Sequence, residues 1–151
     1  MRHLLPILIL LSLGCASPGP AGPTLPETLT FKHVDYEEAG GILPIVGTLE
    51  LTIEPTGEAK SACRRNVLTD VERSGPLSRE QLVALTTRVE AWTAKGATLP
   101  PSAGKHHGLI VYGTKKVGWE KDASLPPELE ALVRFLLTIP PTLRVKERTR
   151  K

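Results

Sequence analysis

Four ionisable side chains near the start of the chain are of the types that acid–base chemistry needs. His33, Asp35, Glu37 and Glu38 lie within one short segment. An imidazole beside carboxylates can take up and release a proton near neutral pH. The other interpretation is that these side chains are solvated charges at the end of a strand. The sequence leaves a hydrolase built on this cluster as one alternative, and we assign no catalytic residue from it.

Two further histidines, His106 and His107, are adjacent in a segment rich in Pro and Gly. Neighbouring side chains point in different directions, and no Cys or carboxylate stands nearby at the spacing of metal ligands. The chain also lacks the G-x-S-x-G and H-E-x-x-H motifs and the glycine-rich loops that hold phosphates or dinucleotides. We therefore expect two loop histidines, no metal, no cofactor and no enzymatic activity.

The amino-terminal segment joins a short positive start to an apolar run from Leu4 to Leu13. The run is too short to span a bilayer, which takes about 20 residues, and is typical of a signal peptide. The segment Leu11-Ser12-Leu13-Gly14-Cys15 then resembles the lipobox of bacterial lipoproteins. In that family the cysteine thiol receives a diacylglyceryl group, and small neighbours admit the peptidase that cuts before it.

The resemblance implies that residues 1–14 are a signal peptide and that Cys15 is the lipid attachment residue. The alternative is an ordinary secretory signal with a chance cysteine. Ala16, rather than Asp, follows Cys15. By the habit of lipoproteins this implies a cell-envelope location, in the outer membrane facing the periplasm where the host is Gram-negative. Residues 15–28 hold several prolines and glycines and are interpreted as the lipidated cysteine and an extended tether.

The charge distribution bears on the partner. The formal net charge is +3, and much of the basic excess falls between Arg144 and Lys151. The middle of the chain is therefore close to neutral, which argues against a nucleic-acid partner. Acylation of Cys15 would leave Cys63 as the second and last cysteine, either buried or paired between chains.

Alternation of apolar and polar residues predicts the strands. The segment Leu49–Glu54 shows it most clearly, and Pro55-Thr56-Gly57 is a turn signal that predicts a hairpin. A second tight hairpin is expected across Gly113-Thr114. The alternating segments are 29–33, 49–54, 58–64, 67–71, 109–112 and 117–119, of which 67–71 is either a separate strand or the far half of a bent one.

Two helices are expected. Ser78 and Gln81 form a capping-box pattern before a helix from Arg79 to Lys95. The second helix begins near Pro126 or Pro127 and ends before Pro140-Pro141. Their apolar faces consist of Leu82, Leu85, Val89 and Trp92 in the first helix, and Leu129, Leu132, Val133, Leu136 and Leu137 in the second.

Together these elements predict an α+β fold, with a single antiparallel sheet of about four to five strands and two helices packed on one face. The domain is expected to span residues 29–140, followed by a basic tail over 141–151. The loop Gly41, Ile42, Leu43 and Pro44 has an apolar tip. Such a tip is either a partner-binding loop or a segment that folds back over the core.

The order of several segments resembles a known family. A strand ends in Ala39-Gly40-Gly41, the strand 49–53 follows, and Leu77-Ser78-Arg79-Glu80-Gln81-Leu82 opens the first helix. A hairpin with Ile110-Val111-Tyr112 and a helix opening at Pro126-Pro127-Glu128-Leu129 come next. The pattern is similar to emfourin-like proteins, which inhibit a thermolysin-like metallopeptidase. This chain lacks the Asp-bearing segment that the family would have before the hairpin and has Gly104-Lys105-His106-His107 there instead. We therefore assign no inhibitory residue.

These observations predict a membrane-anchored bacterial lipoprotein with a non-catalytic binding domain. Its partners would be the membrane, through lipid on Cys15, and an envelope protein, which the resemblance would make a peptidase. The alternatives are a structural envelope lipoprotein without a discrete partner, and a hydrolase that uses the cluster around His33.

Overall fold

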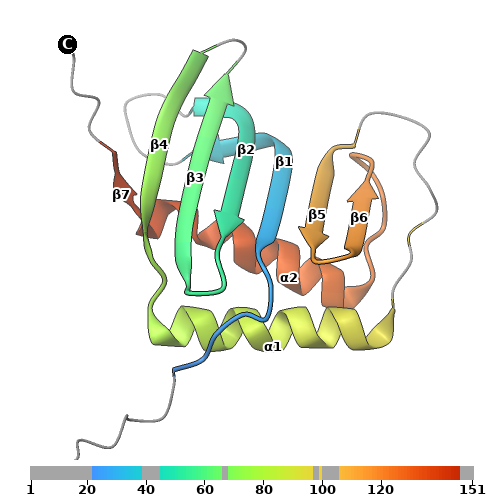
Figure 1. Cartoon of the computed structure of the whole chain (residues 1–151). Helices are drawn as coiled ribbons and strands as arrows, with labels where there is room; N and C mark the ends of the chain where they lie inside the picture. The colour runs from blue at the N-terminus through green and yellow to red at the C-terminus, as the bar shows by residue number, and fades with distance from the viewer. Residues whose placement is uncertain (1–21, 39–44, 66–67, 97–98, 100–105, 147–151) are drawn as a thin grey trace, which may run out of the picture.

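The computed structural model describes residues 22–38, 45–65, 68–96, 99 and 106–146 (Figure 1). The described part contains one antiparallel sheet, in the strand order β6-β5-β1-β2-β3-β4-β7. The strands are β1 (Leu29–Glu38), β2 (Ile45–Ile53), β3 (Glu58–Arg65), β4 (Leu68–Pro76), β5 (Gly108–Tyr112), β6 (Lys115–Trp119) and β7 (Arg144–Val145). The helices are α1 (Arg79–Lys95), α2 (Pro127–Thr138) and the short 3₁₀ helix η1 (Pro140–Thr142).

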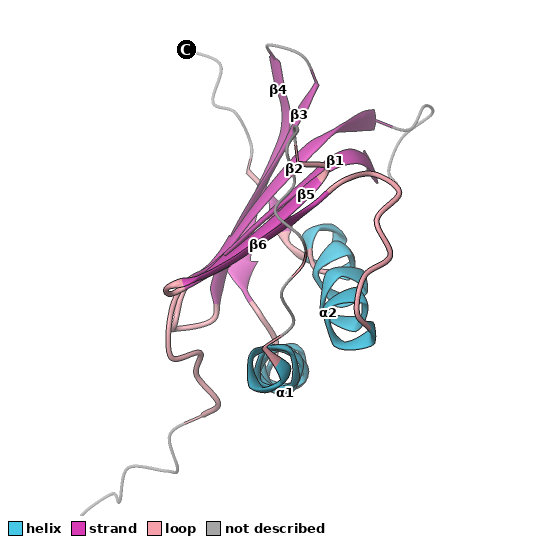
Figure 2. Ribbon diagram, turned by 90° about the vertical axis from the view of Figure 1, so that its right-hand side faces the viewer, coloured by secondary structure: helices cyan, strands magenta, loops and turns pink. Residues whose placement is uncertain are grey.

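Both α-helices lie on the same side of the sheet (Figure 2). This arrangement confirms the predicted α+β class, with one antiparallel sheet and two helices. The predicted helix over Arg79–Lys95 is confirmed with the same bounds, and the second helix begins at Pro127. The opposite side of the sheet has no helix over it within the described residues, and below we call it the open face.

The predicted number of strands is wrong, because the sheet has seven strands and not four to five. The segment after β3 forms a full strand, β4, in which Val71 pairs with Cys63. The seventh strand, β7, is only two residues long and pairs Arg144 with Ser74. Two residues show no periodicity, so a pattern in the sequence cannot reveal such a strand.

The core lies between the sheet and the two helices. Phe31, Leu49, Leu51 and Ile53 of β1 and β2 have no exposed surface. All four residues of the predicted apolar face of α1 are buried, as are four of the five predicted in α2, with Leu137 partly buried. Cys63 is buried in the same core. Since aromatic residues are few, the core is built mainly from branched aliphatic side chains.

Residues on both sides of the predicted domain also enter the core. Leu25, which the sequence analysis assigns to the tether, is only 2 % exposed. Its backbone N–H donates to the carbonyl of Pro55 at 3.3 Å. At the other end, residues 140–146 form η1 and β7, and Leu143 is buried. The ordered unit therefore begins before Leu29 and continues past Pro140.

The hairpin of β5 and β6 contains two positions where a side chain larger than that of glycine would not fit or would be strained. Gly113 has a φ of +56°, which places it in the left-handed region at the tight turn between β5 and β6. Gly108 lies beneath the indole of Trp119, and a Cβ atom there would stand 2.0 Å from the ring. Trp119 in turn stacks on Phe31 with ring centroids 6.5 Å apart. The absence of a side chain at residue 108 therefore lets this indole pack into the core.

The start of α1 yields the first prediction. The Ser78 hydroxyl accepts from the Gln81 backbone N–H, and the Gln81 side chain accepts from the Ser78 N–H. Ser78→Ala removes the first of these bonds, so we expect the free energy of unfolding to fall by about 1 kcal/mol. Urea denaturation of the full chain measures it. Ser124→Ala, at an exposed serine outside the helices, is the control and should leave the midpoint unchanged.

Candidate interaction surface

The predicted acid–base cluster lies at an irregularity in β1. His33 pairs with Leu49 and Tyr36 with Gly47, so β1 holds one residue more than β2 between these pairs. This is a β-bulge, and it reverses the alternation of β1 beyond it. Asp35 within the bulge has a φ of +59°, which is uncommon for a residue other than glycine. Its carboxylate points into solvent, whereas Tyr36 is buried.

The bulge does not assemble a hydrogen-bonded His–Asp pair. The Asp35 carboxylate binds the Lys121 ammonium at 3.0 Å, and both side chains are more than half exposed. This contact, by hydrogen bond and by charge, lowers the pKa of Asp35. Glu37 is exposed on the far side of the bulge, and the side chain of Glu38 lies outside the described residues. Among the three of these side chains that the structure describes, His33 and Asp35 interact, and they do so through their charges.

His33 is half-buried between two aromatic rings. It stacks on Phe31 with ring centroids 5.9 Å apart and meets His107 edge-on at 4.8 Å. Its buried Nδ1 has no hydrogen-bond partner among the described residues. Burial lowers the pKa of the His33 imidazole below its ordinary value of 6.5, the charge of His107 lowers it further, and Asp35 acts in the opposite direction. The site therefore favours a neutral His33.

The adjacent histidines point to different neighbours. His107 contacts His33, and its backbone N–H donates to the Trp119 carbonyl at 2.8 Å. The ring of His106 lies over Gly118, where a Cβ atom would stand 2.4 Å from it. In the part of the chain that the structure describes, no group of three or more His, Cys, Asp or Glu side chains is placed to hold a metal ion.

Two predicted sites lie outside the described residues. They are the lipid attachment residue Cys15 and the candidate partner-binding loop Gly41, Ile42, Leu43 and Pro44. Both remain predictions from the sequence.

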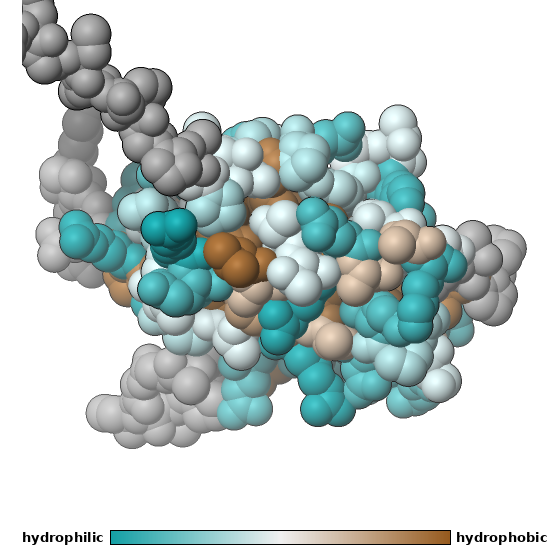
Figure 3. Space-filling model, turned by 90° about the horizontal axis from the view of Figure 1, so that it is seen from below, coloured by the Kyte–Doolittle hydropathy of each residue, from teal (hydrophilic) through white to brown (hydrophobic). Residues whose placement is uncertain are grey.

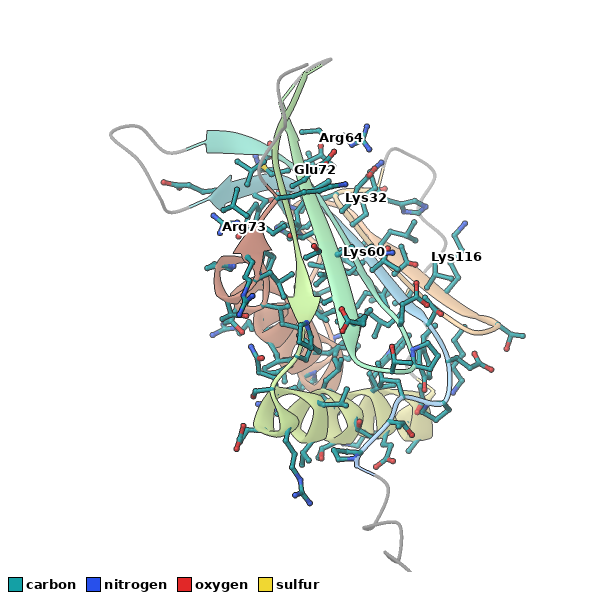
Figure 4. The ribbon with its side chains drawn as sticks, turned by 60° about the vertical axis from the view of Figure 1, so that its left-hand side comes forward. Lys32, Lys60, Arg64, Glu72, Arg73 and Lys116 are labelled. Atoms are coloured by element: carbon teal, nitrogen blue, oxygen red, sulfur yellow. The ribbon has the colours of Figure 1, made fainter. Side chains whose placement is uncertain are left out.

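The open face carries a row of side chains that crosses all seven strands. Strand pairing places each member opposite the next, and alternation along each strand directs them away from the helices. We call it the basic row, because its ionisable members are all cations. From β6 to β7 it consists of Lys116, Val111, Thr30, Thr52, Lys60, Ser74 and Arg144. Lys60 and Lys116 are both exposed, and Figure 4 shows them on β3 and β6.

A second row next to it has mixed charges. It consists of Gly118, Leu109, Lys32, Glu50, Ala62 and Glu72, and we call it the mixed row. Its one cation is paired: Glu50 contacts the Lys32 ammonium at 3.2 Å, and it also contacts the guanidinium of Arg64, next to the row on β3, at 3.5 Å. Glu72 lies 4.0 Å from the Lys146 ammonium. The carboxylates of the mixed row therefore pair with Lys32, Arg64 and Lys146. None of these ion pairs includes a cation of the basic row.

A hollow of about 310 Å³ opens between these rows, over β2, β3 and β4. Its lining includes the hydroxyls of Thr52 and Ser74, the ammonium-bearing side chains of Lys60 and Lys146, and the Glu72 carboxylate. Arg73, from the same region, turns the other way and donates to the Leu143 carbonyl at 3.4 Å (Figure 4). The hollow therefore carries charged and hydroxyl-bearing side chains and lies at the centre of the open face.

A second hollow of similar volume lies where the chain enters the domain. It is lined by Leu25, Glu27, Val89, Glu90, Tyr112 and Lys115, among others. The Lys115 ammonium donates across it to the Thr93 carbonyl at 2.7 Å. Burial raises the pKa of the Tyr112 hydroxyl, a hydrogen bond with the Glu27 backbone acts in the opposite direction, and the charges of Glu27 and Glu90 raise this pKa further. Seen from below, the described surface around α1 is mainly hydrophilic with scattered apolar residues (Figure 3).

The members of the basic row could not be recognised from the sequence. Lys60, Lys116 and Arg144 lie far apart in the chain, and only strand register brings them into line. Alternation in 58–64 does place Lys60 opposite the thin apolar face of Ala59, Ser61 and Cys63. That signal gives the direction of one side chain but not its neighbours.

Comparison with known proteins gives no family assignment: no protein-family model and no curated protein matches this sequence. Neither α1 nor α2, in the described part of the chain, is long and apolar enough to cross a membrane.

The environment of His33 predicts a pH dependence of stability. Its pKa in the folded chain is lowered, so the unfolded chain takes up the proton first as the pH falls below 6.5. We expect the free energy of unfolding to fall between pH 7.5 and 5.5, and His33→Gln to reduce this slope. The lowered pKa of Asp35 acts only at lower pH, near and below 3.8.

Urea denaturation at several pH values measures the slope. His106→Gln, which changes a neighbouring exposed histidine, serves as the control and should keep the slope of the unchanged chain. An equal slope in the His33→Gln chain would show that His33 does not cause it.

Proposed function

We propose that this chain is a membrane-anchored bacterial lipoprotein whose folded domain binds another envelope protein without catalysing a reaction. The observation that carries the proposal is the two-sided sheet. One face is closed by α1 and α2, and the other presents polar and charged side chains on six of the seven strands, with Leu109 and Val111 of β5 between them. A broad surface with ordered charges suits recognition of a partner, because complementary charges set both the rate of encounter and the orientation.

The ion pairs of the mixed row support binding over a merely solubilising role. Glu50 contacts two cations from β1 and β3 at once, which favours one arrangement of the three side chains before any partner arrives. The energy of exposed pairs is small, about 0–1 kcal/mol each, so stability alone gives little reason for them. Pre-ordered side chains lose less conformational entropy on binding.

The anchor rests on the sequence of the amino-terminal segment. Since Leu25 already belongs to the core, the tether between Cys15 and the domain is residues 16–24. An extended proline-rich chain spans roughly 3 Å per residue, so these residues reach roughly 27 Å. That length holds the domain close to the membrane while leaving it free to turn its open face toward a neighbouring protein.

The alternative functions make different predictions. A structural envelope lipoprotein would have no discrete partner on any face. A hydrolase would need the His33 cluster, where the described geometry pairs Asp35 with Lys121 instead. Inhibition of a thermolysin-like metallopeptidase stays a prediction from the resemblance to emfourin-like proteins.

The anchor is tested by mass spectrometry of the chain isolated from bacterial membranes. We expect a mature amino terminus at Cys15 that carries acyl groups, and an extraction that needs detergent. Cys15→Ala removes the nucleophilic thiol, so the product should lack the lipid. An intact Met1 terminus, or an unmodified Cys15 thiol on a chain that leaves the membrane without detergent, would contradict the anchor.

The binding face is tested by photo-cross-linking in cells. A photoreactive amino acid placed at Thr52 on the open face should give one discrete adduct with a second protein. The same amino acid at Val83, which is 47 % exposed on α1, is the matched control and should give none. Absence of adducts at both positions would support the structural alternative, and adducts at Val83 alone would move the interface to the helices.

A further inference from the structure

We infer that the basic row of the open face binds an acidic, extended segment of the partner polypeptide, laid across the strands with one carboxylate over Lys60. The inference rests on the proposed function, since it names the chemistry of the protein that the domain would bind. It commits to side chains of Asp or Glu as the groups recognised.

The spacing of the cations suggests the shape of this segment. Neighbouring strands lie about 4.8 Å apart, so the four steps from β6 to β3 separate Lys116 from Lys60 by about 19 Å. The two steps from β3 to β7 separate Lys60 from Arg144 by about 10 Å. Side chains on one side of an extended peptide recur about every 7 Å. A segment of about nine residues therefore spans the row.

Lys60 is the centre of the proposed contact. It is exposed, it lies on an interior strand, and no acidic side chain pairs with it among the described residues. Its direct neighbours across the sheet are Thr52 and Ser74, whose hydroxyls line the same hollow. An ammonium flanked by two hydroxyls offers a carboxylate one charge-assisted hydrogen bond and two further donors.

Lys116 and Arg144 extend the positive charge of the basic row to the two edges of the sheet. Neither side chain forms an ion pair within the described residues, and both are exposed. In the mixed row beside them, Glu50 already pairs with Lys32, and Glu72 lies next to Lys146. An acidic ligand therefore meets unmatched positive charge only along one line, which fixes its direction on the sheet.

An anionic membrane surface fits these observations less well. A lipid surface meets the whole open face at once, so the carboxylates of Glu50, Glu58 and Glu72 on that face would be repelled by it. Peripheral binding to lipid also gains from exposed apolar side chains that enter the headgroup region. Val111 of the row is only partly exposed, and Val46, an exposed apolar side chain that register places on this face, lies six residues from Thr52 along β2.

Single-stranded nucleic acid has phosphates at a comparable spacing, but a protein surface that binds it also needs a place for the bases. Proteins that bind it stack the bases on aromatic side chains. Alternation puts Tyr112 and Trp119 on the side of the helices, and the open-face residues of the described strands include no Phe, Tyr or Trp. The polypeptide is therefore the occupant that the surface favours.

The experiment measures binding of labelled nine-residue peptides to the full-length chain by fluorescence anisotropy at low salt. The acidic peptide alternates Glu and Ser, and the neutral peptide has Gln in place of Glu. We expect only the acidic peptide to bind, with an affinity that falls as salt is raised. Lys60→Glu should weaken binding at least tenfold, and Lys60→Gln should weaken it less.

Arg79→Glu is the matched control, because it makes the same charge change at an exposed residue of α1. It should change the affinity less than twofold. Circular dichroism checks that each variant is folded, and Lys60→Gln, which keeps a long polar side chain, tests the row even where the charge reversal disturbs the sheet.

Three results would overturn the inference: equal binding of the neutral peptide, unchanged affinity in both Lys60 variants, or tighter Lys60-dependent binding to phosphatidylglycerol vesicles or to an oligothymidine strand. Each can occur while Cys15 is acylated and the open face still forms an adduct, in which case the proposed function stands without this partner chemistry. Loss of the lipid or of every adduct would instead count against the function itself.

Discussion

Burial of only one side of the sheet is the constraint on which the rest of this structure depends. Leu49, Leu51 and Ile53 of β2 have no exposed surface because α1 and α2 cover that side. The period of two along a strand then sends Glu50 and Thr52 to the other side, where water or a partner must meet them. The helices that close the core therefore also define, by exclusion, the surface that remains available for recognition.

The bulge in β1 shows how this constraint acts locally. One extra residue between His33 and Tyr36 turns Tyr36 into the core and leaves Asp35 in solvent. Beside the bulge, His33 contacts His107, and the His107 carbonyl accepts from the Val34 N–H at 2.8 Å. The cluster that looked like acid–base chemistry thus joins β1 to the segment before β5. Its titratable groups influence stability through burial and charge, which needs no substrate.

Features that depend on residues close together in the sequence were predicted correctly, and features that depend on pairing between distant segments were not. The helix Arg79–Lys95 was predicted with its bounds because the capping box of Ser78 and Gln81 and the apolar period lie within the segment or directly beside it. The hairpin across Gly113 is equally local. By contrast, β7 exists only because Arg144 pairs with Ser74, 70 positions earlier in the chain. The basic row has the same origin, since its register joins strands that no local pattern connects.

A cation on an open sheet can have two roles, and position distinguishes them. Lys116 lies on the edge strand β6, where a lysine also protects the edge against pairing with another chain. Lys60 has no such role, because β3 is bordered by β2 and β4. Keeping the face hydrated would be served equally by a lysine paired with an acid, as Lys32 is with Glu50. What hydration leaves unexplained is that the interior lysine stands between two hydroxyls and pairs with neither Glu50 nor Glu72, whose side chains line the same hollow, and recognition of a carboxylate supplied by another molecule accounts for this.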